Sequence, residues 1–151
     1  MGMDVYGIEP REEKGEYFRA NVWCWRPLWE YVCEVCDIEE ETRHSGQFND
    51  GKEIDNEQAV YIGTTLHSLI KMGAVKEYAE TYKNESDALP DVECTHCSGT
   101  GQRDDEHVQG ECNGCHGKGT VRPFETHYPF VEEYVEEFAQ FAKLSGGFEI
   151  C

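Results

Sequence analysis

The sequence predicts an α-rich (α+β) fold in which three to four helices carry an inserted zinc-bound β-hairpin. Apolar residues recur at helical spacing in three stretches of the chain, and proline or glycine residues separate these stretches. Two similar cysteine motifs lie ahead of the last stretch, with a spacer of hairpin length between them. A chain of 151 residues suits one domain, so we expect a single domain over residues 1–151 with a zinc-binding hairpin at residues 91–121.

The first helix is expected to begin near Pro27, after an extended start over residues 1–22, because proline suits the first helical turn. Its expected stripe comprises Leu28, Val32, Val35 and Glu39, with Trp29, Cys33 and Cys36 beside it. A loop is expected at residues 45–51, where Ser-Gly and Asn-Asp-Gly sequences favour turns.

A second helix is expected after Asp55, because Gln58 three residues later completes a capping pattern. Gly73 should interrupt this helix, and a polar helix should continue to about Ala88, before Pro90. Its expected apolar positions are Ala59, Ile62, Leu66, Leu69 and Ile70.

The last helix is expected to start near Pro129 and to end at Gly146 and Gly147. Glutamates are expected on its outer face. Its expected apolar face comprises Val131, Tyr134, Val135, Phe138, Phe141 and Ala142.

The two cysteine motifs predict one zinc ion. Each motif reads Cys-x-x-Cys-x-Gly-x-Gly, and their glycines allow tight turns over a metal. Fourteen residues separate Cys97 from Cys112, enough for a two-stranded hairpin that brings the motifs together. The four thiolates that tetrahedral zinc prefers come from Cys94, Cys97, Cys112 and Cys115.

Four protein thiolates leave no open coordination position, which argues against a catalytic zinc. Two roles are open for the zinc site. The metal would stabilise the hairpin, or the surface beside the metal would bind a partner. Three nearby histidines are either exposed turn residues or replacements for a thiolate, namely His96, His107 and His116.

The cysteine motifs resemble half of the cysteine-rich domain of DnaJ-type chaperones, a family with four such repeats. The resemblance covers roughly residues 94–120 and implies zinc ligation by the four cysteines. The chain has no His-Pro-Asp tripeptide, so the resemblance implies no chaperone activity. Residues 1–7, 15–19, 23–29 and 145–151 resemble a group of small uncharacterised proteins of bacteria and their phages, which implies such an origin and no established activity.

The charge and the hydropathy of the chain indicate which kinds of partner and which compartment to expect. The formal net charge is −18, from 31 acidic and 13 basic residues, which disfavours binding to nucleic acid and to anionic membranes. The N-terminus lacks the basic start and apolar run of a signal peptide, and no apolar stretch is long enough to span a membrane. Reduced thiols favour metal ligation, so we expect a cytoplasmic protein of a bacterium or of a phage that infects one.

Cys33 and Cys36 suit two interpretations. They lie one helical turn apart, so with Cys151 and His44 they would hold a second zinc; Cys24 and His67 are alternative ligands. Otherwise they are small buried core residues.

The segment around Trp23 also suits two interpretations. Three tryptophans around an arginine would stack a flat ligand such as a nucleobase, or they would form part of the core and its rim. The residues concerned are Trp23, Trp25, Arg26 and Trp29.

Ten acidic residues between Glu30 and Glu57, against two basic ones, form either a solvated face or a mimic of DNA phosphates. An acidic run of this kind is usually a solvated face; the resemblance to phage proteins adds some weight to the mimic, since phage inhibitors of host defence often work that way. No phosphate loop, HExxH, nucleophile elbow or dinucleotide fingerprint is present. We therefore expect a non-enzymatic zinc protein that regulates by protein–protein interaction; the alternatives are an acidic DNA-mimic inhibitor and a binder of a nucleotide-like small molecule.

Overall fold

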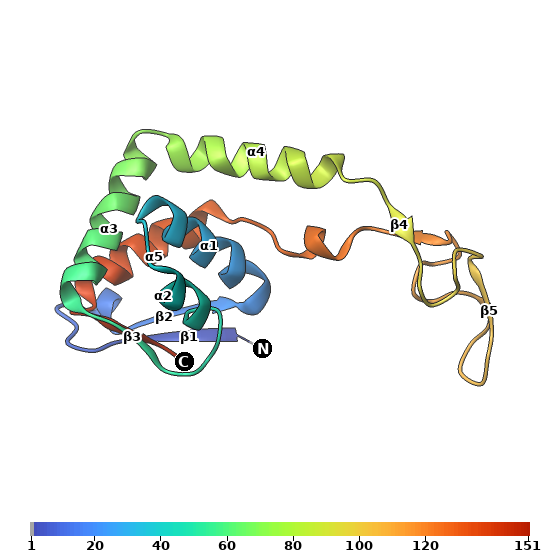
Figure 1. Cartoon of the computed structure of the whole chain (residues 1–151), viewed down its shortest axis with the longest axis horizontal. Coiled ribbons are helices and arrows are strands. Elements are labelled where there is room, and N and C mark those ends of the chain that lie inside the picture. The colour runs from blue at the N-terminus through green and yellow to red at the C-terminus, as the bar shows by residue number, and fades with distance from the viewer. Residues whose placement is uncertain (1) are drawn as a thin grey trace. The chain divides into compact units, whose positions relative to one another are not determined.

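The computed structural model describes residues 2–151, which form a mixed α+β structure with five α-helices (Figure 1). The chain divides into two compact units. The first comprises the residues up to Lys83 together with Tyr128–Cys151, and the second comprises Asn84–His127. The second unit therefore contains the whole of the insertion expected at residues 91–121.

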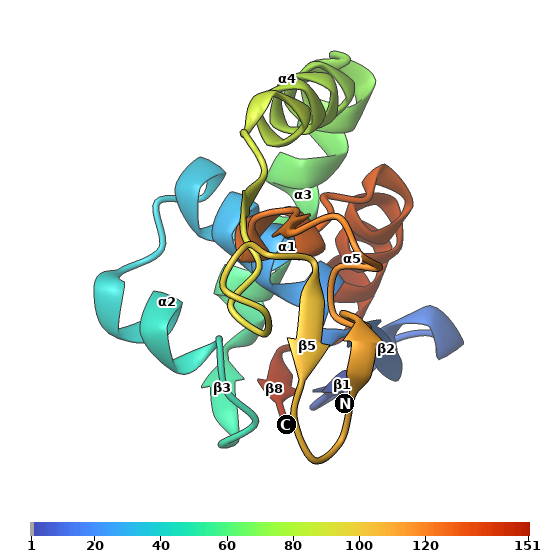
Figure 2. The ribbon, with the colours of Figure 1, turned by 90° about the vertical axis from the view of Figure 1, so that its right-hand side faces the viewer.

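A four-stranded sheet forms the base of the first unit, and its strands run antiparallel in the order β2-β1-β8-β3 (Figure 2). The strands are β1 (Gly2–Gly7), β2 (Tyr17–Asn21), β3 (Lys52–Ile54) and β8 (Phe148–Ile150), with a 3-10 turn η1 (Glu13–Gly15) between the first two. Val5 lies opposite Phe18 in the register, and both side chains are buried. Every second side chain of these strands thus lies on the same face of the sheet, and this face is directed towards the core.

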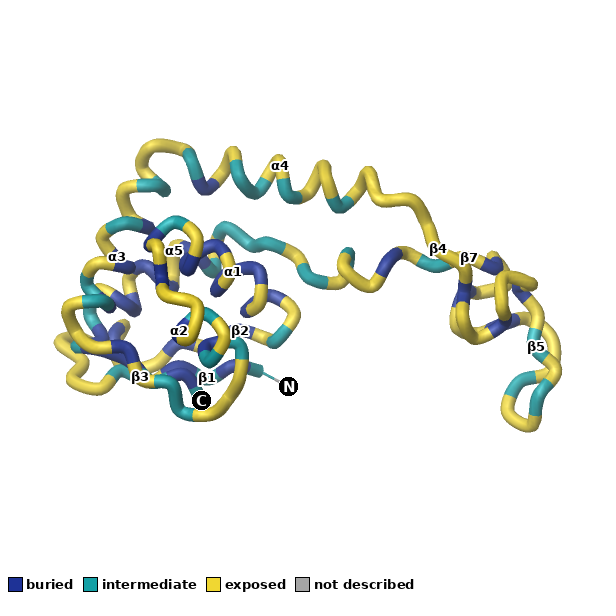
Figure 3. The backbone as a smooth tube through the Cα atoms, in the orientation of Figure 1, coloured by how far each residue is buried: buried dark blue, intermediate teal, exposed yellow. Residues whose placement is uncertain are grey.

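Helices α1 (Val22–Val35) and α5 (Glu132–Leu144) pack over this face, and α3 (Asn56–Lys71) packs mainly against α5. The buried residues gather between these elements (Figure 3). The ring of Phe138 on α5 meets that of Phe148 on β8 edge to face, with centroids 5.6 Å apart. Two further helices are α2 (Glu40–Ser45) and α4 (Ala74–Ala88). None of the five described helices is long and apolar enough to cross a membrane.

Three of the expected helix signals are confirmed. Asp55 caps α3, since its Oδ1 accepts a hydrogen bond of 2.8 Å from the backbone N–H of Gln58. Gly73 separates α3 from α4 and has a φ of 77°, a value that favours glycine. The last helix ends just before Gly146 and Gly147, whose φ values are also positive.

The first helix corrects the sequence prediction. It begins at Val22, not near Pro27, because Asn21 Oδ1 accepts a hydrogen bond of 2.9 Å from the backbone N–H of Cys24 and caps an earlier start. Pro27 lies inside the helix. The helix then ends at Val35, so Glu39 does not belong to its stripe.

The remaining differences concern short elements. The last helix starts at Glu132, three residues after Pro129, because the preceding Val131 is extended. Strands β3 and β8 were not expected, since three residues are too few to show an alternating pattern.

The second unit begins within the last turns of α4 and contains four short strands and a 3-10 turn. These are β4 (Val92–Glu93), β5 (Gln102–Asp104), β6 (Gln109–Glu111), β7 (Thr120–Val121) and η2 (Phe124–His127). β5 pairs with β6 and β4 pairs with β7, both antiparallel. The buried cluster of this unit consists of four cysteines with Val121 packed against it.

Candidate metal centre

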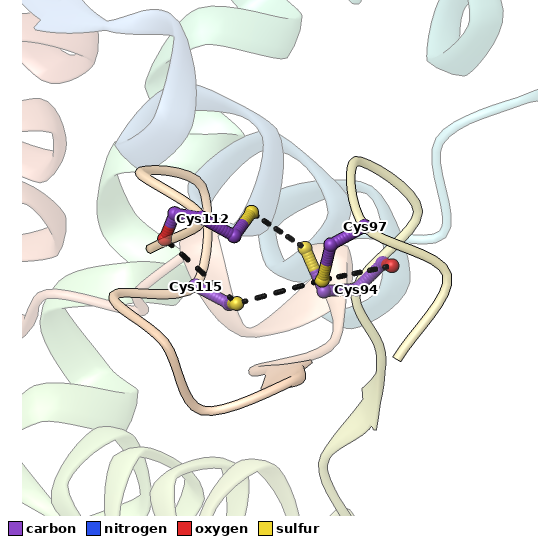
Figure 4. Close-up of side chains that lie close together, drawn as sticks. All are labelled: Cys94, Cys97, Cys112 and Cys115. Atoms are coloured by element: carbon purple, nitrogen blue, oxygen red, sulfur yellow. Dashed lines mark hydrogen bonds between the residues drawn. The ribbon is translucent and has the colours of Figure 1, made fainter. Parts of the chain in front are cut away.

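The four cysteine sulfurs of the second unit converge (Figure 4). All four Sγ atoms lie within 4.8 Å of one another; Cys94 Sγ is 4.0 Å from Cys112 Sγ, and Cys97 Sγ is 3.8 Å from Cys115 Sγ. Sulfurs bonded to a tetrahedral zinc at about 2.3 Å stand about 3.8 Å apart, whereas a disulfide needs about 2.05 Å. The spacing therefore fits a metal ion and excludes disulfides among these cysteines.

The two cysteine motifs hold each other through matching backbone bonds. The N–H of Cys94 donates to the carbonyl of Gly119, and the N–H of Cys112 donates to the carbonyl of Gly101, each at 2.9 Å. The β4–β7 and β5–β6 pairs continue these contacts on opposite sides of the cluster. The unit is thus an internal repeat in which each motif completes the other.

Backbone N–H groups also point at the sulfurs. Gly101 donates to Cys97 Sγ at 3.3 Å, and Gly119 donates to Cys115 Sγ at 3.2 Å. A hydrogen bond to a sulfur stabilises its thiolate form, which is the form that ligates a metal. The sequence motif already contained this signal, because the donor in each case is the second glycine of Gly-x-Gly.

The glycines are required by geometry. Gly101 and Gly119 have φ values of 73° and 78°, and each packs against the backbone of the other motif. A Cβ at Gly101 would lie 2.3 Å from the carbonyl oxygen of Gly117, and one at Gly119 would lie 2.3 Å from that of Gly99. No other residue fits these two positions without moving the backbone.

The thiols do not titrate alike. At Cys97, burial raises the pKa, but hydrogen bonds from the Gly101 N–H and the other three thiols outweigh it and lower the pKa to about 7. At Cys115, burial and the neighbouring thiols raise the pKa to about 11, against the hydrogen bond from the Gly119 N–H. Cys97 therefore ionises readily, whereas a cation beside Cys115 would be needed to ionise that thiol near neutral pH.

Among residues 2–151, no other group of three or more histidine, cysteine or carboxylate ligands converges in this way. Cys33 and Cys36 lie in the apolar core of the first unit, where burial raises their pKa to about 12 and about 11. Cys151 exchanges two backbone hydrogen bonds with Asp4, and His44 packs its ring against Phe48. The structure thus does not show a second metal site.

The tryptophan segment is divided between the core and the surface of the first unit. Trp25 and Trp29 are fully buried and stacked, and their Nε1 atoms donate to backbone carbonyls. Trp23 and Arg26 lie against Tyr128, with the guanidinium 5.5 Å from the ring centre. A ligand cannot stack on the two buried tryptophans.

No family model, curated protein or solved structure matches this chain. The four clustered cysteines are consistent with a zinc-knuckle-like site, and no family or relative supports a DnaJ-type or phage origin. The metal centre rests on its own geometry.

Proposed function

We propose that this protein is a non-enzymatic zinc-binding protein that acts by binding another protein. The convergence of four sulfurs within 4.8 Å supports the zinc, because soft thiolates at this spacing suit Zn²⁺. With all four positions taken by protein thiolates, the metal has no place for substrate or water. The zinc would then stabilise the second unit, whose buried cluster has little apolar content besides the cysteines.

The chain charge supports a protein partner over nucleic acid. The second unit carries nine acidic and three basic residues, so DNA or RNA phosphates would be repelled rather than attracted by it. We further propose that the protein is a regulator in the cytoplasm of a bacterium, encoded by the bacterium or by its phage.

Metal analysis of the purified protein tests the zinc. We expect about one zinc per chain and its loss when Cys94→Ser and Cys112→Ser are combined. Cys151→Ser is the matched control, because this cysteine lies in the first unit and outside the cluster. Zinc content that is unchanged in the double variant would refute the assignment.

Partner retrieval tests the binding role. The tagged, zinc-loaded protein is incubated with bacterial extract and washed at low and high salt. A partner that is retained at high salt and is lost with the double serine variant supports the proposal. Retention that does not depend on zinc would contradict it.

A DNA-mimic inhibitor remains the second candidate, because all ten acidic residues between Glu30 and Glu57 are exposed. This function predicts a basic partner that salt releases and that added DNA displaces. A partner that is insensitive to both would rule it out.

A further inference from the structure

A groove of about 390 Å³ lies beside the cysteine cluster, wholly within the second unit. Its apolar lining comes from Val92, Val121 and Phe124, and the rings of His96 and His127 contribute to it. Phe124 is 62% exposed and Val92 is 44% exposed, so the apolar lining of the groove is accessible to a partner. Apolar surface of this kind in a small concave site is typical of a binding surface.

The two sides of the metal centre differ, and only one of them carries this apolar surface. Val92 pairs with Val121 on the β4–β7 side, whereas the equivalent pair on the β5–β6 side is Gly110 with Arg103. Arg103 forms an ion pair of 2.7 Å with Asp105. One side of the metal centre is therefore apolar and open, and the other is polar and internally paired.

A second difference between the motifs shapes the groove. His96 occupies the position that Gly114 has in the second motif, and the imidazole lies over that glycine. A Cβ at Gly114 would come within 2.6 Å of His96 Cδ2, so only glycine at position 114 leaves space for the His96 ring. Both residues line the groove.

Charge indicates the kind of occupant. Glu93 lines the groove, and the second unit as a whole has a threefold excess of acidic over basic residues. The basic lining residue Arg122 is already held by the carboxylate of Asp91 and the carbonyls of Ser86 and Leu89. The groove thus combines apolar contacts with a negative field.

We infer that this groove binds a short segment of a partner protein in which apolar side chains alternate with lysine or arginine. The apolar side chains pack on Val92, Val121 and Phe124, and the cationic ones face Glu93 and the acidic surroundings. This inference rests on the proposed function, and it specifies the surface and the chemistry of the partner. Because Cys94 is part of the lining, binding depends on the intact metal centre.

Fluorescence anisotropy with a short labelled peptide of alternating lysine and leucine tests the inference on the full, zinc-loaded chain. Peptides with glutamate in place of lysine, or serine in place of leucine, are the ligand controls. We expect the lysine–leucine peptide to bind at least about tenfold more tightly than either control, because only it offers both contacts. Equal binding of the three peptides would overturn the inference.

Substitutions in the groove test whether the peptide binds there. Val92→Ser combined with Phe124→Ser should weaken binding at least about tenfold. The matched control combines Val108→Ser with Tyr61→Ser. Val108 lies between β5 and β6 and outside the groove, and Tyr61 is an exposed aromatic residue of the first unit. This control variant should bind the peptide as the unmodified protein does. If both double variants bind alike, the groove is not the site.

Zinc content separates the two possible failures. If the unmodified protein holds no zinc, the proposed function itself fails. If every variant holds one zinc but the groove variant keeps full peptide binding, the present inference alone is wrong.

Discussion

The backbone N–H of Gly101 donates a hydrogen bond to Cys97 Sγ, and the position of the Cβ that Gly101 lacks would be only 2.3 Å from the carbonyl oxygen of Gly117. One glycine thus supports a sulfur of its own motif and makes room for the backbone of the other. Gly119 does the same for Cys115 and Gly99. The metal centre depends on these second glycines as well as on its cysteines.

Replacement of these glycines should weaken metal binding. In Gly101→Ala or Gly119→Ala, a methyl group meets a carbonyl oxygen and the left-handed backbone is strained by about 1 kcal/mol. We expect zinc to pass to a competing chelator at least about tenfold more readily than from the unmodified protein. Gly110→Ala is the control, since Gly110 has a φ of 110° but nothing within 4 Å of its Cβ position. If Gly110→Ala loses zinc as readily, backbone strain and not the contact is responsible.

Removal of the metal should unfold the second unit alone. All three tryptophans lie in the first unit, whose core contains no residue of the cysteine cluster. We expect a chelator to abolish the dispersed NMR amide signals of the glycines in the second unit. Tryptophan fluorescence and its urea midpoint should stay unchanged. A parallel loss of the fluorescence signal would show that the units are coupled in folding.

Zinc binding should release protons in a pH-dependent number. A thiol must lose its proton to bind the metal, and the pKa of Cys97 is about 7 whereas that of Cys115 is about 11. Because Cys97 already loses its proton above pH 7, we expect about one proton fewer to be released per zinc above pH 7 than well below it. Zinc affinity should therefore fall as the pH falls. A weakly buffered titration with a pH indicator measures the release, and a number that is constant across this range would contradict the ionisation of Cys97 near pH 7.

The core cysteines should make the first unit sensitive to alkali. Burial raises the pKa of Cys33 from 9.0 to about 12 and that of Cys36 to about 11, so the folded state holds these protons more tightly than the unfolded state. The resulting stability is complete below about pH 9 and is lost as the pH rises through the folded values. We expect the urea midpoint to fall above about pH 9, and to fall less steeply in Cys33→Ala with Cys36→Ala. The same slope in both proteins would be inconsistent with ionisation of these thiols.

The cap of the first helix should contribute measurably to stability. Asn21→Ala removes the acceptor for the Cys24 N–H and should cost about 1 kcal/mol of unfolding free energy. Asn21→Asp retains an acceptor at that position and should restore most of the loss. Urea denaturation followed by tryptophan fluorescence gives both values. If Asn21→Asp is as unstable as Asn21→Ala, the side-chain bond is not the cause.

Several parts of the molecule followed from local patterns. The Asp55 cap, the break at Gly73 and the end of the last helix at Gly146 depend on neighbouring residues only, so the sequence was sufficient to predict them. The proposed zinc ligands followed for the same reason, because their spacing and glycines repeat within a short segment. The start of the first helix was misplaced because Pro27 gave a stronger signal than the cap at Asn21.

What the sequence alone determined was therefore local: the helix limits set by caps and glycines, and the four cysteines with their turns. Tertiary structure decided which distant segments meet. β8, at the C-terminal end, lies between β1 and β3, which both come from the first half of the chain, and no periodicity in three residues could predict that pairing. It also decided that Cys33 and Cys36 are buried in the core, and that the apolar residues Val92, Val121 and Phe124 share one groove. Burial and convergence arise from packing between segments, and a linear pattern of residues does not contain them.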